Sequence, residues 1–500
     1  MAKWRPLLLI LALALGLRLI ALSTRSLWYD EAFAVLFSQA GLSKMLYGTL
    51  TPVNGAAADV HPLLYYSLLN VWISIVGDSV AAVRLLSVIT GLATVAVQYA
   101  LARELFDDRT AVAAALIAAI MPFSVQYSQE VRMYALLGLL LLAATWCYVR
   151  GWRTGRAIYW IGFGVLAGLS MYTQQLAAFY LIPLGLIPLW RRDRQLLIRV
   201  VLSGGLALII YAPWLVSLPS QIDKIGGSYW IPKPTPASIL ETFWVFLFVE
   251  LEVRNGLLIG LSFVTLAIVA VFLGWFAIRT LRRPDRDREA LAFVLWLVAA
   301  PIALMWLFSQ WRPVYLNRGL LPCGLMFYIA LGWLLTRTRL PNPIRVLIAL
   351  PVAVTALAGL YEHYTWATFP RPPFAAAVDF LHVPSRPGDR IVHANKITML
   401  PMVYYDRLNH SDPIPARYVD DVAGTGTDTL ARPTQEVIHL LADPDLPTAA
   451  QGASRLWYVI FDRQLSQGNT PADMDWLEGH YQRVSVTSFN DLLIYLYTAR

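Results

Sequence analysis

The sequence has few charged residues for its length. Only 14% of its 500 residues are Asp, Glu, Lys or Arg, whereas 57% belong to the hydrophobic set. A soluble globular protein carries roughly a quarter charged residues, so this deficit indicates that lipid is the main solvent. The apolar residues recur in blocks long enough to cross a bilayer, separated by short clusters of Arg, Pro and polar residues. We therefore predict an all-α polytopic membrane protein.

Several other features are scarce or missing, and each absence narrows the function. The two cysteines, Cys147 and Cys323, each stand inside an apolar block without a partner spacing, which argues against a disulfide framework or a zinc site. No internal repeat of the kind found in many transporters is visible. A Gly-rich phosphate loop between a strand and a helix is also missing, which argues against a nucleotide site. The net charge of +8 comes from residues in short loops, so we expect no nucleic-acid partner.

Arg and Lys predict the orientation, because they collect in short loops on the cytoplasmic side. Lys3 and Arg5 place the N-terminus in the cytoplasm, and about eleven spans then leave the C-terminus outside. The chain could instead begin with a signal peptide cleaved near Ala21-Leu22-Ser23, but we favour an uncleaved first helix in a plasma (inner) membrane protein. The predicted spans are 6–24, 81–102, 110–126, 133–149, two within 157–190, 196–217, 256–278, 290–308, 319–335 and 344–361.

Three apolar or amphipathic runs are predicted to lie in the outer interface rather than to cross the membrane. They are 31–47, 61–77 and 238–252. A true span at 61–77 would reverse every later loop and move the Arg clusters outside. After about residue 371, charge and proline content rise, and short strands are predicted at 390–393, 456–461 and 492–497. We expect a transmembrane catalytic domain at 1–365 and a small extracytoplasmic α/β domain at 366–500.

The first outer loop contains two adjacent carboxylates, Asp30 and Glu31, directly after Trp28 and Tyr29. The simplest interpretation is that Asp30 is a helix N-cap and Glu31 a first-turn acid. The functional interpretation is a general base or a metal ligand beside an aromatic surface. For this motif alone the first interpretation is slightly favoured.

Three further polar clusters are predicted on the same outer face. In Asp59-Val60-His61, the His could bind a phosphate or a metal, or Asp59 could be a cap with Tyr65 an interfacial anchor. In the segment 126–134, Glu130 could hold an acceptor or metal and Arg132 a lipid phosphate, or the segment could be a capped turn. Arg318 could neutralise a lipid phosphate or be a snorkelling anchor. Their shared face favours the functional interpretations.

These motifs resemble those of membrane glycosyltransferases with the GT-C fold that use polyprenyl-phosphate sugars, namely dolichyl-phosphate-mannose protein mannosyltransferases and ArnT-like transferases. The shared elements are Asp30-Glu31, His61-Pro62-Leu63-Leu64-Tyr65-Tyr66, Ser128-Gln129-Glu130-Val131-Arg132-Met133-Tyr134 and Arg318-Gly319-Leu320-Leu321-Pro322. The similarity covers roughly the first 200 residues well. Leu63 replaces a frequent second proline, and Gly319 replaces an aromatic residue.

The resemblance implies that Asp30 is the acid closest to the chemistry, supported by Glu31, with Glu130 a second catalytic acid. His61 would meet the donor phosphate, and Arg132 and Arg318 are further phosphate-binding candidates. The candidate contacts to sugar or acceptor are Trp28, Tyr29, Asp59, Tyr65, Tyr134 and Gln174. A divalent cation, Mg²⁺ or Mn²⁺, is a candidate cofactor at Asp30, Glu130 and His61.

We therefore expect an inverting transfer of one sugar from a polyprenyl-phosphate donor to a lipid, glycan or protein acceptor. A lipid-linked glycan ligase, a polymerase and an oligosaccharyltransferase are alternatives that the sequence separates poorly from this one. A lipid or sugar transporter is disfavoured, because the polar residues gather at one face rather than at the midplane.

Overall fold

The computed structural model describes residues 4–53, 56–228, 231–282, 287–421, 430–466 and 470–500. The residues Lys3, Arg283 and Arg286, which contributed to the predicted orientation, lie outside the described residues. Contacts divide the chain into two compact units. The helical unit comprises Met1–Ile20, Arg84–Val216 and Ile231–Thr365, and the mixed unit comprises Ala21–Val83, Ser217–Trp230 and Trp366–Arg500. The split into functional domains at residue 366 stays a prediction.

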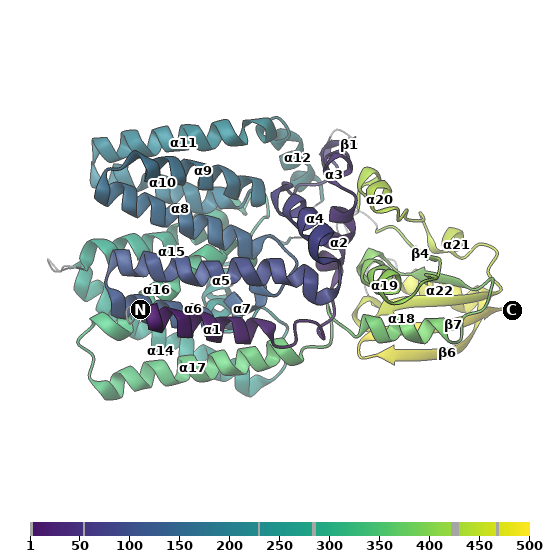
Figure 1. The fold of residues 1–500 in the computed structure, drawn as a ribbon. Coiled ribbons are helices and arrows are strands. Elements are labelled where there is room, and N and C mark those ends of the chain that lie inside the picture. The colour runs from purple at the N-terminus through teal and green to yellow at the C-terminus, as the bar shows by residue number, and fades with distance from the viewer. Residues whose placement is uncertain (1–3, 54–55, 229–230, 283–286, 422–429, 467–469) are drawn as a thin grey trace. The chain divides into compact units, whose positions relative to one another are not determined.

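The helical unit is a bundle of helices that lie side by side (Figure 1). Among the described residues, seven helical segments are long and apolar enough to cross a membrane, and a bent pair adds an eighth if it is counted as one span. The seven are α5 (Val80–Leu105), α8 (Tyr134–Thr154), α11 (Arg194–Leu215), α14 (Gly256–Leu281), α15 (Arg288–Phe308), Asn317–Arg337 with η2 (Asn317–Leu320) and α16 (Leu321–Arg337), and α17 (Asn342–Thr365).

The bent pair is α6 (Asp108–Ile120) and α7 (Pro122–Ser128), which meet at 62°. Pro122 stands at the first position of α7, where the missing N–H of proline is tolerated but the preceding helix is interrupted. The shorter helices of the unit are α1 (Arg5–Leu19), α9 (Ala157–Thr173), α10 (Ala177–Arg191) and α13 (Pro236–Leu247). Together with α1, α9 and α10, these segments lie at the eleven predicted positions. The all-α polytopic fold is confirmed, whereas the number of eleven spans stays a prediction.

Burial separates the core of the bundle from its lipid-facing rim. The apolar window of Asn317–Arg337 is 89% buried, whereas that of Arg194–Leu215 is only 22% buried. On α11, Leu202 and Ile209 are exposed, which is the expected position for side chains solvated by lipid. In the core, a Cβ added at Gly332 of α16 would lie 2.9 Å from the backbone nitrogen of Ala114 in α6, so only glycine allows this close approach.

The mixed unit contains a five-stranded sheet with the order β4-β3-β5-β7-β6. Strand β3 pairs in parallel with β4 and β5, whereas β7 pairs antiparallel with β5 and β6. The strands are β3 (Arg390–His393), β4 (Ala416–Tyr418), β5 (Arg455–Phe461), β6 (Tyr481–Phe489) and β7 (Leu492–Ala499). The predicted small α/β region is confirmed, and β3 has the bounds that the sequence predicted.

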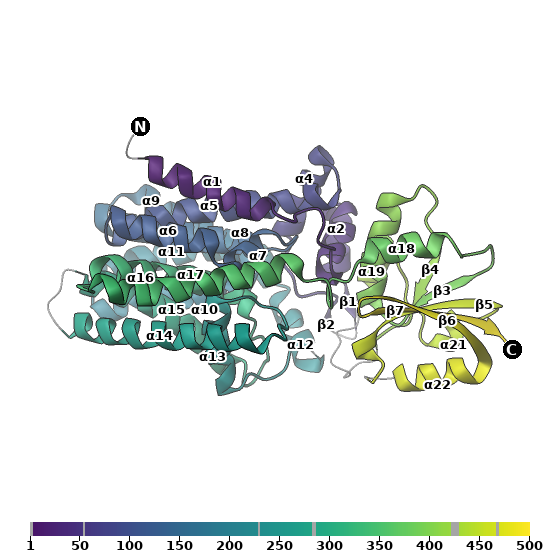
Figure 2. The same ribbon diagram turned by 90° about the horizontal axis from the view of Figure 1, so that it is seen from below.

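Helices cover both faces of this sheet (Figure 2). On one face lie α18 (Phe374–His382) and α19 (Lys396–Asn409), with Phe374 packed edge-on against Phe461 and Phe380 against Trp457. On the other face, α21 (Leu446–Ala449) and α22 (Thr470–His480) bury Leu446 and Leu477 against Tyr458. The remaining elements are the 3-10 turn η3 (Asp462–Gln464) and α20 (Arg432–Ile438).

The first outer loop also belongs to the mixed unit. Its helices are α2 (Tyr29–Gln39), α3 (Leu42–Leu50) and α4 (Leu64–Val76), and the short strands β1 (Pro52–Val53) and β2 (Ala56–Ala57) pair antiparallel. The predicted helical run 31–47 is interrupted because Gly41 has φ = +83°, a conformation that few other residues adopt. The predicted helix at 61–77 begins only at Leu64. The unit is completed by α12 (Leu218–Ser228).

Candidate functional site

The first candidate site lies at the start of α2, where the two adjacent carboxylates have different surroundings. The N-cap of α2 is Trp28, in extended backbone, and Asp30 and Glu31 both stand in the first turn. The prediction that Asp30 would be the N-cap is therefore wrong, because the helix begins at Tyr29. The two acids still stabilise the helix electrostatically, because its N-terminus carries a partial positive charge.

Glu31 is fully buried and paired with Arg371, a residue that follows the last helix of the bundle in sequence. The Arg371 guanidinium donates from Nη1 both to a Glu31 carboxylate oxygen and, at 2.9 Å, to the carbonyl oxygen of Ser26. It also lies 5.7 Å from the ring centroid of Trp28. Asp30, by contrast, is only partly buried. Of the two carboxylates, Asp30 is the more exposed.

The loop before α2 is held by α19. The backbone N–H of Leu27 donates to the Tyr405 hydroxyl at 2.9 Å. The Lys396 ammonium, at the start of α19, lies 5.9 Å from the ring centroid of Tyr29 and is ion-paired with Asp421. Trp28 and Tyr29 therefore each have a cation beside their rings, and the aromatic surface next to Asp30 is fixed rather than loose.

The second candidate group, also in the mixed unit, is built around His61. Its ring nitrogen Nδ1 lies 2.8 Å from Oδ1 of Asp59, the same oxygen that accepts from the backbone N–H of Val60 at 2.5 Å. On α12, Gln221 donates to the Asp59 carbonyl at 3.1 Å and Lys224 donates to the Ala58 carbonyl.

This arrangement fixes the charge of Asp59 and the direction of the His61 ring. Burial alone would raise the pKa of Asp59, but His61 and Lys224 outweigh it and hold that pKa well below its usual range. Because Asp59 engages Nδ1, the Nε2 edge of His61 is the one directed elsewhere. Asp59, predicted as a sugar or acceptor contact, is thus the partner that orients His61.

In the helical unit, the segment 126–134 is buried throughout. Gln129 ties three parts of the bundle together: its amide nitrogen donates to the carbonyl oxygens of Arg18 and Ile20, each at 2.8 Å, and its Oε1 lies 2.8 Å from Nε2 of His363. The two carbonyls stand at the C-terminal end of α1, where the helix leaves them without intrahelical partners. The predicted simple capped turn is therefore a cross-link between α1, α7 and α17.

Charged residues from three segments of the helical unit gather beside this motif. The Arg318 guanidinium lies 5.3 Å from the ring centroid of Tyr134. Glu250, between α13 and α14, accepts a hydrogen bond from Tyr127, and its pKa is raised to about 7 by burial and by the negative charges of Glu130 and Glu241, against the opposing effect of Arg318. Glu130 and Arg132 are buried.

The other predicted contact residues have packing roles that the structure makes clear. Tyr65 is buried and lies edge-on to Tyr66, with ring centroids 6.2 Å apart. Gln174 is buried and is the C-cap residue of α9. Gly319, where the resembling family has an aromatic residue, leaves no room for one: a Cβ there would lie 2.7 Å from Cδ1 of Leu176.

The predicted residues divide between the two units. The mixed unit holds Trp28, Tyr29, Asp30, Glu31, Asp59, His61 and Tyr65, and the helical unit holds Glu130, Arg132, Tyr134, Gln174 and Arg318. Sequence reasoning missed Arg371, Lys224 and Glu250. Arg371 begins an Arg-Pro-Pro run directly after the last span, where a basic residue on the expected outer side was a signal that could have been used.

Comparisons with known proteins show what the chain is similar to. Residues 60–216 match the model of the dolichyl-phosphate-mannose-protein mannosyltransferase family. The crystal structure of ArnT from Cupriavidus metallidurans bound to undecaprenyl phosphate superposes with a TM-score of 0.63, covering 98% of this chain and 97% of that one at 14% identity. The chain has the fold of ArnT. The predicted resemblance is confirmed, and the chain is a multi-pass membrane protein.

Two further similarities bear on function. The undecaprenyl phosphate-alpha-4-amino-4-deoxy-L-arabinose arabinosyl transferase of Pseudomonas aeruginosa (strain UCBPP-PA14) is 26% identical over 377 residues, or 70% of this chain; the alignment spans 64% of the relative's own length. The archaeal oligosaccharyltransferase AglB from Archaeoglobus fulgidus, solved with an inhibitory peptide and a dolichol-phosphate, has a TM-score of 0.53 at 15% identity, covering 99% of this chain and 74% of that one.

Proposed function

We propose that this protein transfers a single sugar from a polyprenyl-phosphate donor to an acceptor hydroxyl or phosphate, with inversion at the anomeric carbon. The observation that carries the proposal is that the two adjacent carboxylates at the start of α2 have different surroundings. Glu31 is fully buried in an ion pair with Arg371, whereas Asp30, beside Trp28 and Tyr29, is only partly buried. A carboxylate that is not fully buried, next to an aromatic surface, is what an acceptor-activating base needs.

The similarity to ArnT and to the arabinosyl transferase supports the class of donor. Fold alone does not assign a reaction, but a shared fold over nearly the whole chain makes the same lipid carrier the first donor to test. The acceptor is a lipid, a glycan or a protein hydroxyl, and membrane lipid surrounds the bundle. We propose a plasma (inner) membrane location with the N-terminus in the cytoplasm and the C-terminal segment outside.

In the proposed step, the acceptor oxygen forms a bond to the anomeric carbon while the bond from that carbon to the phosphate oxygen breaks. The acceptor proton passes to the Asp30 carboxylate, and the electron pair of the broken bond remains on the polyprenyl phosphate. His61, oriented by Asp59, is the proposed donor-phosphate contact, with Arg132 and Arg318 as further cations for the same charge. Glu130 is the proposed second acid.

One rival function has a specific observation in its favour. The similarity to AglB is consistent with transfer of a preassembled glycan block rather than one sugar. AglB matches less closely than ArnT, with a TM-score of 0.53 against 0.63, and only 74% of that chain is covered. The mass added to the acceptor distinguishes the two functions directly.

The test is a transfer assay with purified protein in lipid vesicles and a panel of polyprenyl-phosphate monosaccharides and polyprenyl-linked oligosaccharides. Asp30→Asn should lower the transfer rate by roughly 10²–10⁴-fold, the range for loss of a general base. Asp412→Asn, at an exposed acid of the same unit, is the matched control and should keep the wild-type rate. Full transfer by a well-folded Asp30→Asn variant would remove the base assignment.

Metal dependence and membrane orientation are tested by separate measurements. Chelation followed by Mg²⁺ or Mn²⁺ addition tests the predicted cation at Asp30, Glu130 and His61. Orientation is tested with a cysteine placed at exposed position 412, because the native Cys147 and Cys323 are both buried. Labelling from the outside only is expected, and labelling from the cytoplasm only would reverse the topology.

A further inference from the structure

We propose that His382, Asp406 and His410 form a binding site for a divalent transition-metal ion in the mixed unit, made of residues other than those assigned to sugar transfer. The three residues come from two packed helices. His382 is the last residue of α18, Asp406 lies in the last turn of α19, and His410 is the C-cap residue of α19. Neither the motifs nor the proposed transfer reaction uses any of them.

The geometry brings one potential ligand atom from each residue within 4.8 Å of the other two. His382 Nε2 lies 2.7 Å from Oδ1 of Asp406, and His410 Nε2 lies 2.9 Å from Oδ1 of Asp379. The two imidazole rings are stacked, with centroids 3.7 Å apart and planes inclined by 14°. Each imidazole is therefore already beside a carboxylate.

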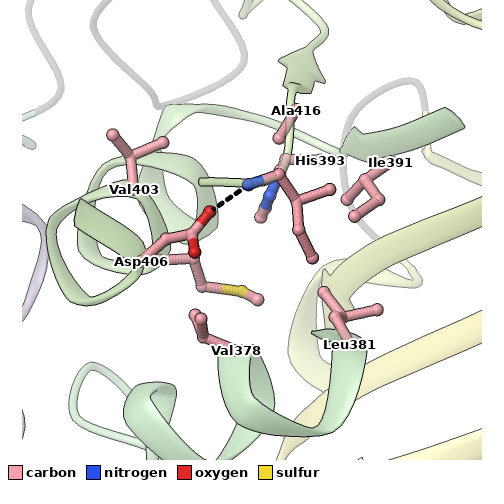
Figure 3. Close-up of a pocket in the computed structure, with 9 residues that line it drawn as sticks. Val378, Leu381, Ile391, His393, Val403, Asp406 and Ala416 are labelled. Atoms are coloured by element: carbon pink, nitrogen blue, oxygen red, sulfur yellow. Dashed lines mark hydrogen bonds between the residues drawn. The ribbon is translucent and has the colours of Figure 1, made fainter. Parts of the chain in front are cut away.

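Asp406 is held in place independently of the two histidines. Its second oxygen, Oδ2, accepts from the backbone N–H of Ile414 at 2.8 Å, the bond dashed in Figure 3. Its carboxylate stands at the edge of a pocket whose walls include the apolar side chains of Val378, Leu381 and Ala416 (Figure 3). A backbone donor that fixes a ligating carboxylate is the kind of support found around metal sites.

The donor set determines the class of ion. Two imidazoles with one carboxylate, and Asp379 as a second carboxylate at the rim, suit Zn²⁺ and related transition metals, whereas Mg²⁺ and Ca²⁺ prefer sites made of oxygen alone. Two neutral imidazoles and two carboxylates carry a charge of −2, which a divalent ion neutralises. For metal–ligand bonds of about 2.0–2.1 Å in a tetrahedron, ligand atoms are roughly 3.3 Å apart. Binding therefore requires the His382–Asp406 distance to lengthen slightly.

Binding also requires the stacked rings to separate. The lone pairs of two stacked imidazoles lie in nearly parallel planes about one ring separation apart, so they do not converge on one ion at bonding distance. His410 is the ring that can turn, because it follows the last residue of α19 and its side chain is about 25% exposed. The proposed ion thus binds Asp406 and His382 first, and the His410 ring then leaves the stack to bind it. The bound ion would link α18 to the end of α19.

The test uses the full-length protein, stripped with a chelator and titrated with Zn²⁺ alone, with bound metal measured by mass spectrometry after equilibrium dialysis. We expect one Zn²⁺ per chain that resists competition by excess Mg²⁺ or Ca²⁺. His410→Ala and His382→Ala should each weaken binding at least tenfold. The matched control is His480→Ala, another histidine of the same unit, which packs on Trp476 and should bind Zn²⁺ like the wild type.

A second measurement separates loss of a ligand from loss of folding. Zn²⁺ should raise the thermal unfolding midpoint of the wild type and of His480→Ala, because an ion that binds only the folded state stabilises it. It should leave the midpoint of a folded His410→Ala protein unchanged. Wild-type Zn²⁺ binding by His410→Ala and His382→Ala, or no saturable binding by the wild type, would show that the cluster is only two stacked histidines, each hydrogen-bonded to a carboxylate.

Discussion

Arg371 donates from Nη1 to the carboxylate of Glu31, although the two residues are 340 positions apart in the chain. The pair is almost fully buried, with side-chain exposures of 2% and 0%. It joins the segment that follows the last membrane helix to the first turn of α2. The Glu31 charge is therefore balanced by Arg371, which is the reason why we propose Asp30, and not Glu31, as the base.

Removing one partner of this pair should destabilise the mixed unit strongly. Arg371→Gln leaves the Glu31 charge buried without its counterion, which costs about 3–5 kcal/mol in comparable pairs. The thermal unfolding midpoint of the purified protein should fall accordingly. The double variant Arg371→Gln with Glu31→Gln should recover much of the loss, because no isolated charge remains buried.

The surface pair Arg432–Glu436 provides the control for that measurement. Its atoms are 3.3 Å apart, but the side chains are 58% and 43% exposed. Arg432→Gln should change stability by no more than about 0.5 kcal/mol. Equal effects of the Arg371 and Arg432 substitutions would contradict the assigned burial of the Glu31 pair.

Asp59→Asn should weaken binding of the lipid donor while leaving the fold intact. The amide cannot hold the His61 ring as the carboxylate does, so we expect transfer to fall roughly 10–100-fold, as when an orienting carboxylate behind a ligating histidine is removed. Steady-state kinetics should show mainly a higher KM for the lipid donor. An unchanged KM would mean that His61 does not contact the donor.

The pH dependence of this variant follows from the sign of the pKa shift. The Asp59 pKa is depressed, so the stability contributed by its carboxylate is present above the unfolded-state pKa and is lost only as pH falls through the lower folded-state value. The stability advantage of the wild type over Asp59→Asn should therefore shrink progressively as pH falls below about 4, where the unfolded-state carboxylate becomes protonated. Unfolding midpoints of both proteins, measured as the pH is lowered, provide the check.

The contribution of Glu250 to stability should depend on pH in the opposite direction to that of Asp59. Its folded-state pKa is raised from 4.5 to about 7, so its stabilising contribution is complete below the unfolded-state value and is lost as pH rises through about 7. We expect the unfolding midpoint of the wild type to fall between pH 5 and 8. Glu250→Gln should remove that component, whereas the exposed Glu252→Gln should retain it. Identical pH slopes for all three proteins would refute the burial-driven shift.

Any residue larger than glycine at position 319 is expected to lower the free energy of unfolding. A Cβ would meet Leu176 Cδ1 at 2.7 Å, so Gly319→Ala forces that side chain to move and should cost about 1–3 kcal/mol. Adding Leu176→Ala should relieve the clash. Gly185 in α10 is the matched control, because a Cβ there meets nothing within 4 Å, and Gly185→Ala should stabilise the helix by up to about 1 kcal/mol. Thermal unfolding of the four proteins tests the difference.

Much of the secondary structure could be predicted because its signals are local. A membrane span is specified by a window of about 20 apolar residues, and β3 by a short apolar run between charged and polar residues. Strand β6 was missed because most of its residues are exposed at the edge of the sheet, so it lacks the alternation of a half-buried strand. The break at Gly41 depends on one backbone angle that hydrophobic periodicity does not report.

The sequence by itself determined that the protein is a membrane protein, which segments form its apolar helices, and which residue types could carry sugar transfer, because each of these depends on composition within a short window. Only the tertiary structure showed that Glu31 is buried against Arg371 whereas Asp30 is partly buried, and only it revealed that Asp59 orients His61, with Gln221 and Lys224 nearby. These outcomes depend on which side chains meet after the chain folds. The partner that buries Glu31 lies 340 residues away, beyond the reach of any local pattern.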